Sequence, residues 1–200
     1  GLSYPVKELK VLQRMETFVK QGDEAKLAFD MDFIGLQNYT REVVKYSAFT
    51  PYIRAAIVPP YKRNAEMTSM GWEIYPESIY QVLKKYAGYT NIPEMIITEN
   101  GAAFPDKVVN GTVQDIKRIA YLQGCLKQVL RAKKEGVNVK GYFVWSLLDN
   151  FEWAKGYRPR FGLVYVDFQT QQRIIKSSGY WYSRFLQCVE TAEDIPGYIR

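Results

Sequence analysis

The run Met95-Ile96-Ile97-Thr98-Glu99-Asn100-Gly101 joins a short apolar stretch to polar residues that follow it directly. A short apolar run that does not alternate is typical of a buried parallel strand, because such strands are covered on both faces. The carboxyl ends of parallel strands are where α/β proteins build their sites. The run therefore predicts a strand over 95–98 with candidate site residues at its end.

Amphipathic helical patterns flank this strand on both sides. Pro76 opens a helix that carries apolar residues at helical spacing and stops at Gly88. A second pattern runs from about Gln114 to Glu135, and Gly136 is its stop. The residues of the second helix that we expect to face inward are Ile116, Ile119, Leu122, Leu126, Val129 and Leu130.

The same alternation continues toward both ends of the chain. The further predicted elements are a helix over 5–21, strands over 32–39 and 139–147, a weakly alternating strand over 163–168, and a helix near 177–189. Alternating helices and strands are typical of an α/β fold in which crossover helices join parallel strands. Between Thr40 and about Gly71 little periodicity is present, and a long loop of this kind is usually functional.

The predicted sheet is too small to be complete. Three parallel strands with apolar faces leave two unpaired edges, whereas parallel sheets are covered on both faces. The chain opens with Gly1-Leu2-Ser3-Tyr4-Pro5, without an initiator Met or a targeting signal. We therefore expect residues 1–200 to form one partial domain that belongs to a longer folding unit.

Composition excludes several classes of protein. The 200 residues are 47% apolar and 15% aromatic, which suits a globular chain, and no apolar run approaches the roughly 20 residues of a membrane span. The net charge of +6 comes from Lys and Arg that are scattered among acids, as in the run Arg131 to Glu135. This pattern favours a solvated helix face over a nucleic-acid footprint, which needs concentrated charge.

The absence of histidine limits the possible chemistry. Without His and without a paired Cys motif, this chain alone cannot assemble a zinc site, a Ser-His-Asp triad or a Cys-His nucleophile. Cys125 and Cys188 lie in predicted helices, so we expect them to be reduced core residues, which favours a cytoplasmic location. We also expect no cofactor and no metal. Carboxylates, Tyr and Lys remain as chemical groups.

The polar and aromatic residues at the predicted strand ends suit sugar chemistry. The candidate site contains Tyr39, Glu99, Trp145, Glu152 and Trp153. Flat aromatic rings hold the apolar face of a sugar, while carboxylates and amides bind its hydroxyls.

Several blocks of the sequence, in order, resemble the family 1 glycoside hydrolases. They are residues 32–40 (DFIGLQNYT), 70–77 (MGWEIYPE), 97–101 (ITENG), 141–153 (GYFVWSLLDNFEW), 156–157 (GY) and 160–167 (RFGLVYVD). The blocks cover nearly the whole chain, which makes the resemblance specific. It implies the C-terminal portion of a (β/α)8 barrel, about strands six to eight with their helices, of the retaining β-glucosidase type.

The resemblance implies catalytic roles for two residues. Glu99 matches the nucleophile of the family, whose carboxylate attacks the anomeric carbon and forms a covalent glycosyl-enzyme that water hydrolyses with retention. Tyr39 matches the tyrosine whose hydroxyl binds that carboxylate. Without the resemblance, Glu99 could be a carboxylate that caps or pairs at a strand end, and Tyr39 a core tyrosine.

The resemblance also implies substrate-binding residues. Glu152 and Trp153 match the pair that binds the far hydroxyls of the glycone, and an acid at Glu152 favours an unphosphorylated sugar because it would repel a phosphate. Trp145 resembles the platform under the sugar ring, Phe161 an aromatic wall and Trp72 part of the aglycone site. Each could otherwise be a core residue, and Phe161 most readily.

The chain departs from the family pattern at important positions. It has Gln37-Asn38 where many relatives show Asn-Tyr, so neither residue receives a role. It contains no Asn-Glu-Pro block, which carries the acid/base glutamate in the family, and a retaining mechanism needs two carboxyl groups. The N-terminal half of the barrel is therefore expected as a separate chain or as a missing segment.

Two interpretations remain. In the first, the chain is the C-terminal part of a β-glucosidase that acts on a β-glucoside or related oligosaccharide. In the second, a half-barrel persists as a noncatalytic sugar-binding or assembly protein, which should aggregate or dimerise through its exposed strand edges.

Overall fold

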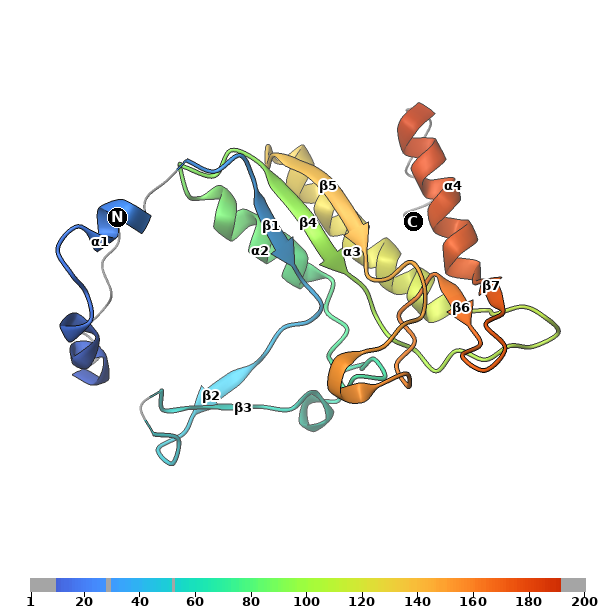
Figure 1. Ribbon diagram of the computed structural model, residues 1–200, viewed down its shortest axis with the longest axis horizontal. Helices are drawn as coiled ribbons and strands as arrows, with labels where there is room; N and C mark the ends of the chain where they lie inside the picture. Colours follow the sequence, from blue (N-terminus) through green and yellow to red (C-terminus); the bar gives the residue numbers. More distant parts are fainter. Residues whose placement is uncertain (1–9, 28–29, 52, 192–200) are drawn as a thin grey trace.

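A three-stranded parallel sheet organises the protein. The computed structural model describes residues 10–27, 30–51 and 53–191. The sheet order is β1-β4-β5, formed by Ile34–Gln37, Met95–Asn100 and Val139–Val144. Helices α2 (Glu77–Ala87) and α3 (Ile116–Lys134) connect the strands and lie together on one face of the sheet (Figure 1). The predicted α/β fold with crossover helices is confirmed.

The core lies between the sheet and these two helices. Leu36, Met95, Ile97 and Val139 of the strands pack against Ile79 and Leu83 of α2 and Val129 and Ala132 of α3. A second apolar cluster joins α3 to α4 (Ser177–Thr191) around Leu122, Leu126, Trp181 and Phe185. Gly124 inside α3 has a packing reason, because a Cβ there would lie 2.8 Å from the Pro76 ring. The predicted ends of α2 and α3 agree with the structure to within about two residues.

The other face of the sheet has no helix over it within the described ranges. Phe33 and Phe143 are 51% and 59% exposed, and Gly35 and Thr98 on the same face are also exposed. β1 and β5 each pair with β4 and with no further strand of the described chain. The sheet is therefore open at both edges, as the sequence predicted, and it forms no closed barrel.

The long stretch after β1 is more ordered than the sequence predicted. It contains an antiparallel ribbon of β2 (Val44–Tyr46) and β3 (Ala55–Ile57), followed by the 3-10 helix η2 (Pro60–Arg63). The ribbon extends away from the carboxyl end of the sheet (Figure 1). Strands of three residues leave too little periodicity to be recognised in a sequence.

The segment after β5 differs from the expectation in two ways. The strand expected over 139–147 ends at Val144, and the strand expected over 163–168 is reduced to β6 (Val164–Val166). β6 pairs antiparallel with β7 (Arg173–Ile175) and is not part of the parallel sheet. Between these strands and β5 lies the short 3-10 helix η3 (Trp153–Lys155). The predicted last helix is confirmed as α4.

Two helix predictions need correction. Part of the helix expected over 5–21 lies outside the described residues, and the rest is a 3-10 helix, η1 (Lys10–Thr17), followed after Gly22 by the short α1 (Asp23–Leu27). Ile116 was expected to face inward but is 62% exposed, because it is the first residue of α3 and its side chain faces a surface pocket.

The two cysteines differ in burial: Cys125 is buried in the core, as expected, whereas Cys188 is only partly buried. Neither Cys125 nor Cys188 is in a disulfide, and burial raises the pKa of the Cys125 thiol to about 12. In the described part of the chain, no helix combines the length and apolar character that a membrane crossing requires.

Candidate active site

Glu99 lies near the end of β4 and is held by two donors from the neighbouring strand end. The Gln37 side-chain amide donates to Oε1 of Glu99 over 2.8 Å, and the Tyr39 hydroxyl donates to Oε2 over 2.6 Å. Gln37 is the register partner of Glu99 across the β1–β4 pair. Each oxygen of the carboxylate is thus fixed by one uncharged group, and the side chain remains partly accessible.

Tyr39 is at the centre of an aromatic group. Its ring lies 5.4 Å from Trp72 and 6.2 Å from Phe161, and these two rings are 6.1 Å apart. Burial, the hydrogen bond to Glu99 and the charges of Glu99 and Glu152 raise the pKa of the Tyr39 hydroxyl. The hydroxyl therefore stays protonated and acts as a hydrogen-bond donor to the carboxylate.

A buried amide fixes the ends of the three strands beneath the site. The Asn100 side chain is fully buried and donates to the Asn38 carbonyl oxygen over 2.6 Å and to the Tyr121 hydroxyl over 3.0 Å. The Tyr142 hydroxyl donates to the side-chain oxygen Oδ1 of Asn100. Residues from all three strand ends and from α3 therefore meet at Asn100.

The predicted glycone-binding residues fall into two groups. The Trp145 indole N–H donates to Oε1 of Glu152 over 3.0 Å, and Glu152 is 9% exposed. Trp153 is 84% exposed and has a backbone φ of 45°. The structure thus brings Trp145 and Glu152 together, and Trp153 lies on the surface beside them. Phe161, at 2% exposed, is a buried wall of the Tyr39 group.

Gly101 allows the Trp145 segment to approach Glu99. A Cβ at Gly101 would lie 1.8 Å from the carbonyl oxygen of Trp145, so only glycine permits this contact between two backbones. The Trp145 N–H donates to the Asn100 carbonyl oxygen over 2.9 Å, and the Trp145–Ser146 peptide bond is cis.

Sequence reasoning missed Gln37, although a signal for it exists. Side chains two apart on a strand share a face, so a Tyr39 that reaches Glu99 places Gln37 on the same face. Asn38 is buried, accepts a hydrogen bond from the Ser78 hydroxyl over 3.0 Å, and donates its N–H to the Glu99 carbonyl oxygen. Gln37 therefore contacts the nucleophile candidate, and Asn38 fixes its backbone.

Sequence reasoning also missed a buried ion network behind the site loops. Lys176 is fully buried and donates to Asp149 over 2.8 Å and to Asp106 over 2.5 Å. Arg118 binds Asp106 and Asp115, and Arg160 binds Asp149. Burial and the nearby Arg118 charge lower the pKa of Lys176, although both carboxylates oppose the shift. The network joins the loops after β4 and β5 to the starts of α3 and α4.

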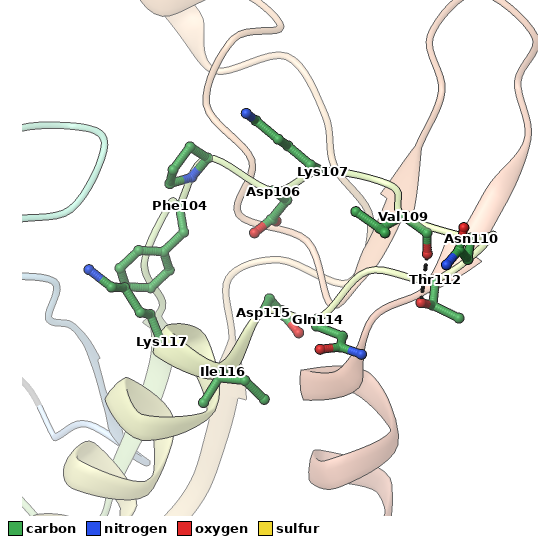
Figure 2. Close-up of a pocket in the computed structure, with 11 residues that line it drawn as sticks. Phe104, Asp106, Lys107, Val109, Asn110, Thr112, Gln114, Asp115, Ile116 and Lys117 are labelled. Carbon is green, nitrogen blue, oxygen red and sulfur yellow. Dashed lines mark hydrogen bonds between the residues drawn. The ribbon is translucent and has the colours of Figure 1, made fainter.

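A surface pocket of about 460 Å³ lies between the loop after β4 and the first turn of α3 (Figure 2). Asp106 and Asp115 line it, and both carboxylates are engaged in ion pairs. Glu99 and its aromatic neighbours do not line this pocket.

A carboxylate at the carboxyl end of a parallel strand, held by neutral donors among aromatic rings, is the type of site that α/β enzymes acting on sugars use. Comparison with known proteins identifies the group: the family model described as "Glycosyl hydrolase family 1" matches residues 2–191. The chain therefore belongs to glycosyl hydrolase family 1.

The relatives of the chain are longer than the chain itself. It is 52% identical over 168 residues to the 1,4-beta-D-glucan glucohydrolase of Thermotoga neapolitana. This alignment covers 84% of this chain and 37% of that protein. It is 43% identical over 192 residues to beta-glucosidase A of Acetivibrio thermocellus, covering 92% of this chain and 42% of that protein.

Comparison with solved structures also finds beta-glucosidases. The solved structure of the beta-glucosidase from Thermotoga maritima in complex with azafagomine matches with a TM-score of 0.81 and 46% identity, covering 92% of this chain and 41% of that chain. These neighbours are TIM barrels, and the present chain corresponds to part of one.

Proposed function

We propose that this chain is the C-terminal, nucleophile-bearing portion of a retaining β-glycosidase of the β-glucosidase type, equivalent to about strands six to eight of the barrel. The observation that carries the proposal is the Glu99 carboxylate, with Gln37 on one oxygen and Tyr39 on the other. The proposed substrates are terminal β-linked, unphosphorylated sugars, because Glu152 would repel a phosphate dianion.

In this proposal Glu99 attacks the anomeric carbon of the sugar. The new bond from a Glu99 oxygen forms as the bond to the leaving oxygen breaks, and water later releases the sugar with retention of configuration. Tyr39 donates a hydrogen bond that orients the attacking carboxylate. Trp145 and Glu152 bind the glycone together with Trp153, and Trp72 and Phe161 form aromatic walls.

The second carboxyl group comes from outside this chain. A retaining enzyme needs an acid/base carboxyl about 5–5.5 Å from the nucleophile to protonate the leaving oxygen. The chain spans 37% to 42% of the length of its relatives, and its sheet is open at both edges. We propose that the N-terminal portion, as a separate chain or as a preceding segment, supplies this carboxyl and closes the barrel.

A reconstitution experiment tests whether the two carboxyl groups come from different portions of the barrel. The chain alone should not hydrolyse p-nitrophenyl β-glucoside, and mixing it with the N-terminal portion of the barrel should restore turnover. Robust hydrolysis by the pure 200-residue chain would contradict the proposal. Glucose binding without any turnover in the mixture would support instead a noncatalytic sugar-binding protein.

A trapping experiment tests the nucleophile. An activated 2-deoxy-2-fluoroglucoside slows the second step of a retaining enzyme, so the covalent intermediate accumulates. In the reconstituted enzyme, mass spectrometry should find the label on the peptide that contains Glu99. A label on another peptide would exclude Glu99 as the nucleophile.

A further inference from the structure

Glu73, the residue after Trp72, is a buried carboxylate between two arginines. It is 5% exposed, and Arg41 and Arg63 each bind both of its oxygens. The Arg41 distances are 3.0 and 3.0 Å, and those of Arg63 are 3.1 and 2.8 Å. Hydrogen bonds from Arg41 and then Arg63 lower the pKa of Glu73 to about 2, so the Glu73 side chain is ionised at neutral pH. We call these three residues the Glu73 clamp.

The Glu73 clamp connects the segment that carries Tyr39, the tyrosine that binds Glu99, to the segment that carries Trp72. Arg41 lies two positions after Tyr39, and Glu73 directly follows Trp72. The Thr40 hydroxyl also donates to the Glu73 carbonyl oxygen over 3.0 Å. Arg63 approaches from η2, at the far end of the long segment after β1. The clamp therefore fastens that segment at two points onto the backbone that carries Trp72.

Trp72 should depend on the clamp more than Tyr39 does. Tyr39 has further anchors, because its hydroxyl binds Glu99 and its carbonyl oxygen accepts a hydrogen bond from the Tyr121 hydroxyl over 3.2 Å. Trp72 lies in a short loop in which the Thr68 N–H donates to its carbonyl oxygen over 2.9 Å. A change at Glu73 should therefore displace the Trp72 ring while the Tyr39–Glu99 contact persists.

We propose that Glu73 is a positioning residue that holds the Trp72 ring against Tyr39 and Phe161. Two bidentate ion pairs to one buried carboxylate give the fixed geometry that a stacking surface requires. For sugar chemistry this inference rests on the proposed function, together with the family resemblance that implies Trp72 as part of the aglycone site. The clamp would then determine how tightly a leaving group binds, not how Glu99 attacks.

Fluorine NMR of the 200-residue chain tests the positioning without any substrate. The chain has four tryptophans, so labelling with 5-fluorotryptophan gives four resonances, and Trp72→Phe identifies the one from Trp72. Its shift reports on the neighbouring Tyr39 and Phe161 rings. Glu73→Gln should move and broaden the Trp72 resonance and leave those of Trp145, Trp153 and Trp181 in place.

Matched variants distinguish a local displacement of the Trp72 ring from a change in the whole fold. Glu77→Gln removes another carboxylate that is paired with an arginine, Arg131, and it should leave all four resonances unchanged. If Glu73→Gln does not fold, Arg63→Lys keeps the charge, loses the bidentate fork, and should shift the Trp72 resonance in the same direction. The inference is overturned if the Trp72 resonance stays in place, or if all four resonances move equally.

Steady-state kinetics of the reconstituted enzyme provide a second test of the role of Glu73. Glu73→Gln should raise KM for cellobiose about threefold to tenfold, the range expected for loss of one aromatic contact, with kcat/KM for β-glucosyl fluoride within about twofold. Equal losses for both substrates would overturn the positioning role. A wild-type mixture without turnover would count against the proposed function, and the NMR result would still decide the role of Glu73.

Discussion

Two groups of carboxylates in this protein are held in opposite ways. Asp106 and Asp149 are buried and receive Lys176 and an arginine each, whereas Glu99 is partly accessible and receives the neutral groups of Gln37 and Tyr39. A cation beside a carboxylate stabilises its charge and lowers its nucleophilicity, while neutral donors orient it with less loss of reactivity. The ion network is therefore a support, and Glu99 is suited to attack.

The two groups are connected through the same loops. The ion network lies where the loops after β4 and β5 meet the starts of α3 and α4, and the same loops carry Gly101, Trp145 and Glu152. Below them Asn100 fixes the strand ends. A half-exposed carboxylate can keep a defined position because the backbone around it is held by buried contacts.

The largest expected effect is at Glu99. In the reconstituted enzyme, Glu99→Gln should lower kcat by a factor on the order of 10⁴ or more, because an amide cannot form the glycosyl-enzyme. The thermal midpoint of the chain should change little, since no ion pair is lost. Steady-state kinetics on p-nitrophenyl β-glucoside measure the effect, and near-normal rates would show that the nucleophile assignment is wrong.

Breaking the ion network should affect stability instead. Lys176→Met leaves Asp106 and Asp149 short of a cation inside the protein, so the free energy of unfolding should fall by about 3–5 kcal/mol. Lys140→Met, which removes a surface pair with Glu94, should cost less than about 1 kcal/mol. Urea denaturation of the chain measures both. If the two variants lost similar amounts of unfolding free energy, the buried ion network would stabilise the fold no more than a surface ion pair does.

A smaller effect on catalysis is expected at Tyr39. Tyr39→Phe keeps the aromatic contacts with Trp72 and Phe161 but removes the donor to Oε2 of Glu99. A hydrogen bond to a charged group contributes about 1.5–3 kcal/mol, so kcat should fall about 10-fold to 100-fold. Gln37→Leu, which removes the other neutral donor, is the companion variant. No change in either variant would mean that these donors do not orient the carboxylate.

The last prediction concerns the pH dependence of stability. The pKa of Glu73 is lowered from its usual value near 4.5 to about 2, so its contribution is present above pH 4.5 and is lost as the pH falls toward 2. In wild type, unfolding free energy should decline across this window, and Glu73→Gln should flatten that decline. Urea titrations at several pH values measure the slope, with Glu77→Gln as the control. Equal slopes in wild type and Glu73→Gln would refute the linkage.

Local patterns predicted the elements that build the sheet. The apolar runs at 33–36, 95–98 and 139–147 predicted the three strands, although the last strand ends earlier, at Val144. The helical spacing around Leu83 and Leu126 predicted the two helices, because a helix that is buried on one side repeats its apolar residues at the helical period. Shorter elements were missed or misplaced. β2, β3 and β7 have three residues each, and η1 is a 3-10 helix where an α-helix was expected.

The sequence by itself determined the parallel α/β architecture, the open edges of the sheet and the identity of Glu99 and Tyr39 as site candidates. Only the tertiary structure decided that Gln37 joins them, that Lys176 supports Asp106 and Asp149, and that two arginines meet at Glu73. The physical reason is the range of the interactions. The periodicity of a helix or strand depends on residues that are close in the sequence, so a local pattern predicts it. The hydrogen bonds and ion pairs of the site join side chains that are distant in the chain and meet only when the strands are in register.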